Sequence, residues 1–399
     1  MKLSHLFATL GIIVCTTAAW FLLAATLSHR TSQSSASMRG EVSGVWGPEL
    51  TQLHPQAWFE TPNAPGGKAR VLPSASKVDV ILRSDPKRRG LIWHRTYDVN
   101  FKGDYAFTNP TRIPQTLYLS FKFPENAKGL KQSEVKLGEA DDKSATLPDT
   151  SGAVTRAILL PASSSITLHA RYQTRGSDSW IYHFPDNRRI SGFDLTMKTN
   201  FTEINFPVGT GSAGPRTPDN EGYTLGWNYP DDLAAPSIGM DMPKRLNAGP
   251  VASRIAFFAP VSLLLFVTVM LLIAGIRRIP LHPMHIFFVA AGFFAFHLLF
   301  AYLVDLLPLA VSFGIAALAS ALLVCGYLRL VGGPPLLRIA LPAQAIYLIL
   351  FSASFFFDGL TGITLTILSV LTLALLMVLT AKTDWRAFFG RKPPPLSAE

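Results

Sequence analysis

His297 and Asp305 are the residues of this sequence whose type and surroundings could do chemistry inside a membrane. His297 lies within the apolar run "FAFHLLFAYLVDLL", and Asp305 stands near its end. Ionisable side chains in such runs mark ion or proton paths, or hydrogen bonds between helices. A spacing of eight residues places the two about 80° apart around a helix, so they do not stack on one line. The sequence therefore favours a packing hydrogen bond across helices for His297 over a proton relay.

Asp358 is a third candidate of the same kind. It stands between two apolar runs, and we expect both it and Asp305 at the outer membrane interface. His297, Asp305 and Asp358 are thus the functional candidates of the sequence. We predict no catalytic residue, no cofactor and no metal, because no HExxH and no nucleophile-elbow motif occurs.

His282 and His285, in "LHPMHI", are spaced so that they could share a metal if other ligands approached. No acidic residue or cysteine stands nearby, which favours a solvated turn at a membrane interface. His54, His94, His169 and His183 are scattered over separate segments, and their spacing proposes no site.

The candidates lie among apolar segments that must position them. The first segment, Leu6–Leu27, has no charged residue and is long enough to cross about 30 Å of hydrocarbon. We expect an uncleaved anchor here, since a cleaved signal peptide has a shorter apolar core. Five further spans are predicted after Pro250: Ala252–Ile276, Met284–Val304, Leu309–Leu330, Leu336–Phe357 and Leu360–Ala381.

Basic residues flank these segments on one side. With a cytoplasmic N-terminus, the turns at 277–283 and 331–335 and the tail lie inside. Nearly all of the flanking Lys and Arg then lie inside, and the turns near Asp305 and Asp358 carry none. This distribution obeys the positive-inside rule at every short connection. It places both termini in the cytoplasm and the long insert in the periplasm.

The insert between the first and second spans has the pattern of β-strands. In "TLYLSFKF", "SITLHARYQT" and "FDLTMKTNF" the apolar residues alternate, as in antiparallel strands with one wet face. Turn-rich breaks separate the runs, and no amphipathic helix is expected in the insert. The pattern predicts a sandwich or an open barrel. A segment of about 220 residues is large enough to form its own core.

Charge and cysteine content exclude other classes. The net charge of the chain is +10, but residues 28–253 carry 26 Lys and Arg against 22 Asp and Glu. The excess lies beside the apolar runs, so we predict no nucleic-acid binding. The two cysteines, Cys15 and Cys325, fall within predicted spans, and no disulfide is available to the insert.

Small residues recur at helical spacing in the later spans. Ala316 and Ser320, Ala317 and Ala321, and Gly362 and Thr366 are such pairs, and Ser369 and Thr372 extend the last set. Faces of this kind let helices approach closely. We therefore expect the five C-terminal spans to form a compact bundle.

The segments "LHPMHIFFVAAGFFAFHLLFAYLVD", "IAALASALLVCGYLR" and "LMVLTAKTDW" resemble the bacterial inner-membrane CreD family. The resemblance is good over about 270–385. In the insert it rests chiefly on "WGPEL". His297 stands where the family usually has Tyr, and Asp305 where it has Glu. The start of the second span, "SRIAFFAP", also departs from the family pattern, so the chain looks like a divergent member. The family implies a role in envelope integrity and envelope stress, and it supplies no catalytic residue.

The predicted architecture is a membrane protein with an N-terminal transmembrane helix, a periplasmic all-β sandwich-like domain and a bundle of five transmembrane helices. The boundaries are 1–29 for the anchor, 30–250 for the domain, 251–385 for the bundle and 386–399 for a cytoplasmic tail. The expected partners are the lipid bilayer, envelope components and other membrane proteins. We expect a non-enzymatic protein of the bacterial inner membrane whose periplasmic domain binds an envelope component. The alternatives are a transporter or lipid-handling protein, and a periplasmic hydrolase on a membrane stalk.

Overall fold

The computed structural model describes residues 3–62, 64–89, 92–138, 148–149, 152–185, 189–277, 279, 281–357 and 359–381. The chain divides into two compact units. Ala36–Arg245 form the first, called here the β unit. The described residues on either side of it form the helical unit. Each unit is described by itself.

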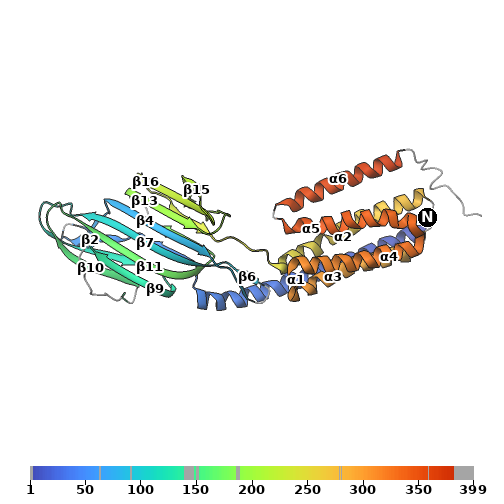
Figure 1. The fold of residues 1–399 in the computed structure, drawn as a ribbon, viewed down its shortest axis with the longest axis horizontal. Helices are drawn as coiled ribbons and strands as arrows, with labels where there is room; N and C mark the ends of the chain where they lie inside the picture. Colours follow the sequence, from blue (N-terminus) through green and yellow to red (C-terminus); the bar gives the residue numbers. More distant parts are fainter. Residues whose placement is uncertain are drawn as a thin grey trace, which may run out of the picture. The chain divides into compact units, whose positions relative to one another are not determined.

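The described helices of the chain (Figure 1) are α1 Leu3–Trp46, η1 Pro65–Gly67, α2 Ala248–Ile276, α3 Pro283–Leu306, α4 Leu309–Gln344, η2 Ala345–Leu350, α5 Phe351–Ala353, η3 Ser354–Phe356 and α6 Leu360–Thr380. The described strands are β1 Leu50–Leu53, β2 Gln56–Glu60, β3 Lys68–Val71, β4 Ala75–Ser84, β5 Lys87–Arg89, β6 Ile92–His94, β7 Thr96–Thr108, β8 Gln115–Lys122, β9 Lys128–Leu137, β10 Ala153–Leu160, β11 Ser165–Ser177, β12 Ser179–His183, β13 Arg189–Thr199, β14 Thr210–Gly211, β15 Arg216–Pro218, β16 Tyr223–Leu233 and β17 Ser237–Asp241.

The strands of the β unit form one large sheet, two smaller sheets and a short hairpin. The large sheet has the order β15-β16-β13-β4-β7-β11-β9, and Figure 1 shows β13, β4, β7, β11 and β9 side by side. The smaller sheets have the orders β1-β12-β17-β14 and β10-β8-β2-β3. Buried side chains from all three sheets join a single hydrophobic cluster, so the unit is a sandwich with one core.

Alternation along the strands confirms the predicted inward faces. Leu117, Leu119 and Phe121 of β8 are buried, and so are Leu168, Ala170 and Tyr172 of β11 and Phe193, Leu195 and Met197 of β13. Successive side chains of a strand point to opposite faces of the sheet. An apolar residue at every second position therefore buries one face and leaves the other exposed to solvent.

The prediction of purely antiparallel strands was wrong at three pairings. β13 lies parallel to β4, β1 parallel to β12, and β14 parallel to β17. Alternation of apolar residues reports which face is buried, but it does not report the direction of the neighbouring strand. The parallel contacts therefore could not be predicted from the pattern.

The N-terminal helix is longer than the predicted anchor. α1 continues from Leu27 to Trp46, so the first residues of the segment expected to be strand-rich are helical. No proline interrupts the sequence before Pro48. The helix ends at Trp46, and the next residue, Gly47, has a φ of 93°, a left-handed conformation that favours glycine.

Among the described residues, five helical segments are long and apolar enough to cross a membrane. Six spans were predicted, and the difference lies at Leu309–Phe356, which holds two of them. Gly333 breaks this segment with φ 67° and ψ −164°, a conformation open only to glycine. Pro334 follows at the start of the second part, where the missing N–H of proline is not needed. The predicted turn at 331–335 is thus a bend at one residue.

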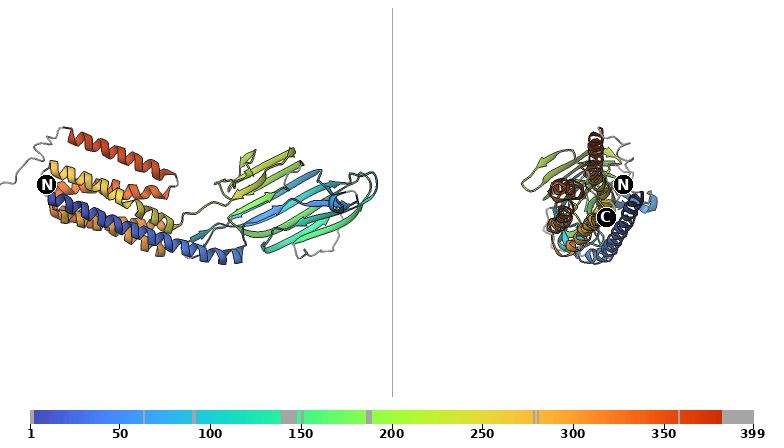
Figure 2. Two further views of the ribbon diagram at one scale, coloured as in Figure 1. Left: turned by 180° about the vertical axis from the view of Figure 1, so that it is seen from behind. Right: turned by 90° about the vertical axis from the view of Figure 1, so that its right-hand side faces the viewer.

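Helices α2, α3 and α4 bury much of their surface against one another, whereas α6 does not. Only Leu368 and Thr372 of α6 are buried, and Figure 2 shows α6 at the margin of the helices. Gly362 and Thr366 are exposed, so the predicted close approach through this pair was wrong. Ala316, Ala317 and Ser320 of α4 are buried, as small residues at a helix contact should be.

Candidate functional site

His297 is buried in the helical unit and makes its hydrogen bond within its own helix. Its Nδ1 atom lies 2.8 Å from the carbonyl oxygen of Phe293, one turn earlier on α3. The ring meets Trp20 of α1 edge-on, with 5.5 Å between ring centroids. The predicted hydrogen bond across helices was therefore wrong for Nδ1. The contact of His297 with α1 is the ring contact with Trp20.

Asp305 lies away from His297 and has a different partner. Its carboxylate forms an ion pair and hydrogen bond with the guanidinium of Arg30 on α1. Both side chains are partly exposed, so the pair is a surface contact between α1 and the C-terminal end of α3. Asp358 lies outside the described residues. The structure thus does not bring His297 and Asp305 together.

His282 and His285 both have local structural partners. The Met284 backbone N–H donates to Nδ1 of His282, which caps the start of α3. Nδ1 of His285 lies 2.8 Å from the hydroxyl of Tyr327 on α4. Over the described part of the chain, no group of three or more His, Cys, Asp or Glu residues could hold a metal ion.

The helical unit buries a set of polar side chains that the candidates do not include. These residues, called here the polar belt, are Ser262, Ser320, Gln344, Tyr347 and Thr372, and all are buried. The Ser320 hydroxyl donates to the carbonyl oxygen of Gly292, 2.8 Å away, and the Gln344 amide donates to that hydroxyl at 3.1 Å. These bonds join α3 to both parts of α4.

The second half of the polar belt is built around the π-helical turn η2. The Ser262 hydroxyl of α2 donates to the Tyr347 carbonyl oxygen. The Tyr347 hydroxyl lies 2.7 Å from the Thr372 hydroxyl, which donates to the carbonyl of Leu368. A π-helical turn disturbs the regular backbone hydrogen bonds, and a buried hydroxyl from a neighbouring helix compensates. The polar belt contains no charged group, so its chemistry is that of helix pairing.

The core of the β unit holds a buried imidazole among aromatic rings. Nδ1 of His54 lies 2.8 Å from the Tyr182 hydroxyl, which lies 3.0 Å from the Tyr105 hydroxyl. Burial lowers the pKa of His54 to about 3 and raises the pKa of Tyr105, because the charged form of each would lose its solvation. His54 is therefore neutral at physiological pH and acts as a core residue.

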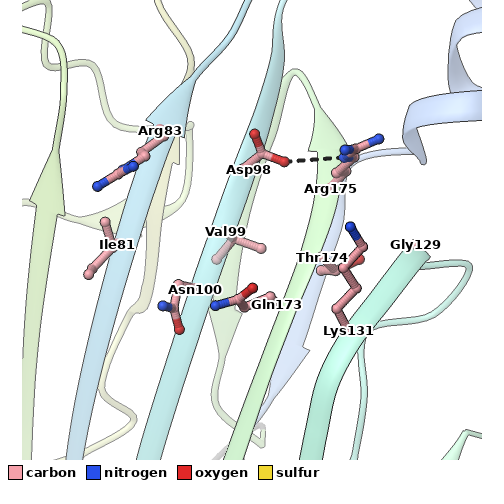
Figure 3. Close-up of a pocket in the computed structure, with 10 residues that line it drawn as sticks. All are labelled: Ile81, Arg83, Asp98, Val99, Asn100, Gly129, Lys131, Gln173, Thr174 and Arg175. Atoms are coloured by element: carbon pink, nitrogen blue, oxygen red, sulfur yellow. Dashed lines mark hydrogen bonds and ion pairs between the residues drawn. The ribbon is translucent and has the colours of Figure 1, made fainter.

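The wet face of the large sheet carries a hollow of about 340 Å³, called here the sheet-face pocket. Figure 3 shows its lining on neighbouring strands: Ile81, Arg83, Asp98, Val99, Asn100, Gly129, Lys131, Gln173, Thr174 and Arg175. The strands that supply these residues are β4, β7, β11 and β9. Ile81, Arg83, Asp98, Asn100, Gln173 and Arg175 alternate with buried residues such as Leu82 and Phe101, which fixes these six on the side away from the core, whereas Val99 and Thr174 are buried.

Two cross-strand ladders build the sheet-face pocket. In the first, Asn100 pairs with Ile81 on one side and with Gln173 on the other. Gln173 in turn pairs with Lys131 of β9. In the second ladder, Asp98 stands between Arg83 and Arg175.

An irregular edge strand shapes one wall of the sheet-face pocket. The pairing of β9 with β11 shifts register on both sides of Gln173. Gly129 and Gln132 have left-handed φ values of 65° and 48° there. Such bulges bend an edge strand and change the direction of its side chains.

Arg175 is held in place from two sides. Its Nε atom donates to Asp98 at 3.3 Å, and its guanidinium lies 4.7 Å from the centre of the Trp46 ring. A cation over an indole face is attracted by the ring, and the planar guanidinium also stacks on it. The lining offers cations, amides and one carboxylate. This set can bind an anionic or hydroxyl-rich molecule without any covalent step.

The comparisons concern the C-terminal part of the chain. The family model "Inner membrane protein CreD" matches residues 223–386. Over these residues the chain is similar to the CreD family. The resemblance predicted from the apolar segments is confirmed, and the match begins at β16 of the β unit. The CreD match and the five apolar helical segments together make this a membrane protein.

Comparison with curated proteins gives no match. Among solved structures, the chain is similar to a Legionella pneumophila protein described provisionally as nutrient-binding. The two are 12% identical with a TM-score of 0.30, and the alignment covers 52% of this chain and 76% of the other.

The CreD match covers the candidates of the helical unit but not the sheet-face pocket. His297, Asp305 and the polar belt lie within residues 223–386, whereas every residue of the sheet-face pocket precedes them. The family match therefore bears on the helical unit and leaves the pocket to be argued from its own geometry.

Sequence reasoning missed most of both sites. Ser320 and Thr372 were noted only as small residues, and Gln344 in "LPAQAIYLIL" could have been recognised as an amide within an apolar run. The sheet-face pocket gives no such local signal. Its residues come from four strands whose pairing the alternating pattern does not specify.

Proposed function

We propose that this CreD-family protein is a non-enzymatic inner-membrane protein that binds an envelope component through its β unit. One observation carries the proposal: the sheet-face pocket offers fixed polar groups on a rigid sheet. Its lining of cations, amides and one carboxylate suits binding, and that carboxylate, Asp98, is already paired with Arg175.

The orientation in the membrane is part of the proposal. Within the helical unit, Leu281, His285 and Leu328 line the same small cavity, so the end of α2, the start of α3 and the end of the first part of α4 lie together. Arg277 and Arg329 stand at this end, and basic residues favour the cytoplasmic side. The other end of α3, with Asp305, then faces the periplasm, and so does the β unit.

The orientation is tested by inserting a reporter enzyme that is active only in the periplasm at Gly152 in the β unit. Activity is expected there, and the matched fusion after Ala381 should be inactive. A reporter active only after Ala381 would contradict the proposal.

Binding is tested with full-length protein in a neutral detergent. Asn100→Trp places a large ring in the sheet-face pocket, while Thr167→Trp adds the same ring elsewhere on β11. Soluble saccharide fragments of the cell envelope should bind the wild type and Thr167→Trp, and Asn100→Trp should lose the binding. Equal binding by all three proteins would refute the pocket as the site, and with it the proposed function.

A further inference from the structure

The charge on the wet face of the large sheet is not evenly distributed. The sheet-face pocket has three cations, Arg83, Lys131 and Arg175, against the single carboxylate of Asp98. The pairing extends the excess on both sides, since Ile81 pairs with Lys198 and Arg175 with Lys128.

A neighbouring ladder on the same face has no such excess. Lys102 of β7 pairs with Asp79 and with Arg171, and Arg171 pairs with Glu134 of β9. Two cations there stand between two anions, and the charges balance. The net positive charge is therefore a property of the sheet-face pocket that this neighbouring ladder does not share.

The cations of the sheet-face pocket are not equally engaged. Arg175 already has Asp98 and the Trp46 ring as partners, which hold its guanidinium at the wall. Arg83 and Lys131 are exposed residues at opposite sides of the hollow, on β4 and β9. A ligand with an anionic group can therefore engage either of them at little desolvation cost.

Between these cations stand two amides. Asn100 and Gln173 pair across β7 and β11, and Figure 3 shows their side chains next to each other. Side-chain amides donate and accept together, which matches the hydroxyl and acetamido groups of sugars. A hollow of about 340 Å³ is of the size that holds a small ligand.

We propose that the sheet-face pocket binds a saccharide that carries an anionic group, with Asn100 and Gln173 contacting the sugar and Arg83 and Lys131 contacting the anion. This inference rests on the proposed function and narrows it to a ligand class. The anion can be the phosphate of a phosphorylated glucosamine disaccharide or the carboxylates of a disaccharide-peptide fragment of the cell wall.

The experiment compares three probes by calorimetry with the full-length protein in a neutral detergent. They are a glucosamine disaccharide bisphosphate, a disaccharide-tripeptide with free carboxylates, and an uncharged N-acetylglucosamine disaccharide. Binding of either charged probe, at least about tenfold tighter than the uncharged one, is expected. The charged probe that binds more tightly identifies the source of the anion.

Variants assign the binding to the named side chains. Arg83→Gln and Lys131→Gln should each weaken binding of the charged probe about tenfold. Arg171→Gln makes the same change on β11 in the neutral ladder and should leave binding unchanged. Asn100→Ala should weaken charged and uncharged probes by a similar factor. Circular dichroism and gel filtration show whether each variant is folded.

Two results would overturn the inference while leaving the proposed function intact. One is equal binding of charged and uncharged probes that Asn100→Trp still abolishes. The other is an equal loss in Arg83→Gln and Arg171→Gln, which would reflect general surface charge. Absence of binding by all three probes would overturn the inference as well.

Discussion

The β unit and the helical unit treat polar groups in opposite ways. The β unit buries aromatic rings, and the wet face of its large sheet carries charged residues such as Arg83 and Lys131. The helical unit exposes large apolar side chains such as Leu322, Val370 and Val378 and buries the hydroxyl and amide groups of the polar belt. In water, apolar burial holds a fold together, whereas in a bilayer small residues and hydrogen bonds between helices do so.

Both units nevertheless bury a histidine in a similar way. His54 is buried among rings of the β unit, and His297 is buried against Trp20 in the helical unit. Each has a single short contact from Nδ1 to an oxygen, to Tyr182 and to the Phe293 carbonyl respectively. A histidine in an apolar run is therefore no sign of chemistry unless the fold brings a second ionisable group to it.

The largest effect should come from the aromatic core of the β unit. Phe193→Ala removes a fully buried ring that contacts Phe184 at 4.8 Å and Tyr182 at 5.4 Å between centroids. We expect a loss of about 3–5 kcal/mol in the free energy of unfolding of the β unit. Denaturant unfolding followed by tryptophan fluorescence measures it. Leu159→Ala, at an exposed site of β10, is the matched control and should cost little. Similar losses in both variants would contradict the assigned core.

The next largest effect should be a pH dependence of the free energy of unfolding of the β unit, caused by His54. Its pKa is about 3 in the fold and about 6.5 when unfolded. Above pH 6.5 both states are neutral; below it the unfolded state takes up a proton that the folded state does not. The stability present above pH 6.5 is therefore lost as the pH falls, by about 2 kcal/mol between pH 6.5 and pH 5.

His54→Gln keeps a polar partner for Tyr182 and removes the titrating group. The difference in unfolding free energy between pH 7.5 and pH 5 should be smaller in this variant by that amount, even if the variant is less stable at neutral pH. An unchanged acid response would show that His54 is not buried as a neutral ring.

The smallest effect should come from the polar belt of the helical unit. Ser320→Ala removes the acceptor of the Gln344 amide and the donor to the Gly292 carbonyl. We expect a loss of about 1 kcal/mol, because hydrogen bonds between membrane helices contribute modestly. Unfolding in mixed detergent and sodium dodecyl sulfate measures it. Thr366→Ala, whose hydroxyl bonds only within exposed α6, should have no effect. A cost for Ser320→Ala as large as that of Phe193→Ala would erase the contrast between the units.

Local patterns predicted much of the fold. The alternation in β8, β11 and β13 identified their buried faces, and the apolar runs identified every helix of the helical unit. The bend at Gly333 was predicted as a longer turn because two prolines, Pro334 and Pro335, stand together there. The extension of α1 to Trp46 was missed, since a polar segment gives no period of buried residues when little of it is buried.

The sites were much less predictable. His297 was singled out because it lies in an apolar run, yet its partners, Phe293 and Trp20, could be known only from the fold. The ion pair of Asp305 with Arg30 joins residues that are far apart in the sequence. Neither the sheet-face pocket nor the π-helical turn η2 has a local signature.

The sequence by itself determined which segments are apolar enough for a membrane, which strand faces are buried, and the similarity of residues 223–386 to the CreD family. These properties depend on hydropathy and period, which neighbouring residues specify. The tertiary structure alone decided that Asn100 lies beside Gln173, that three cations gather on one part of the sheet, and that Gln344 meets Ser320. Strand order, register and helix contacts bring these residues together, and each depends on the packing of the whole unit.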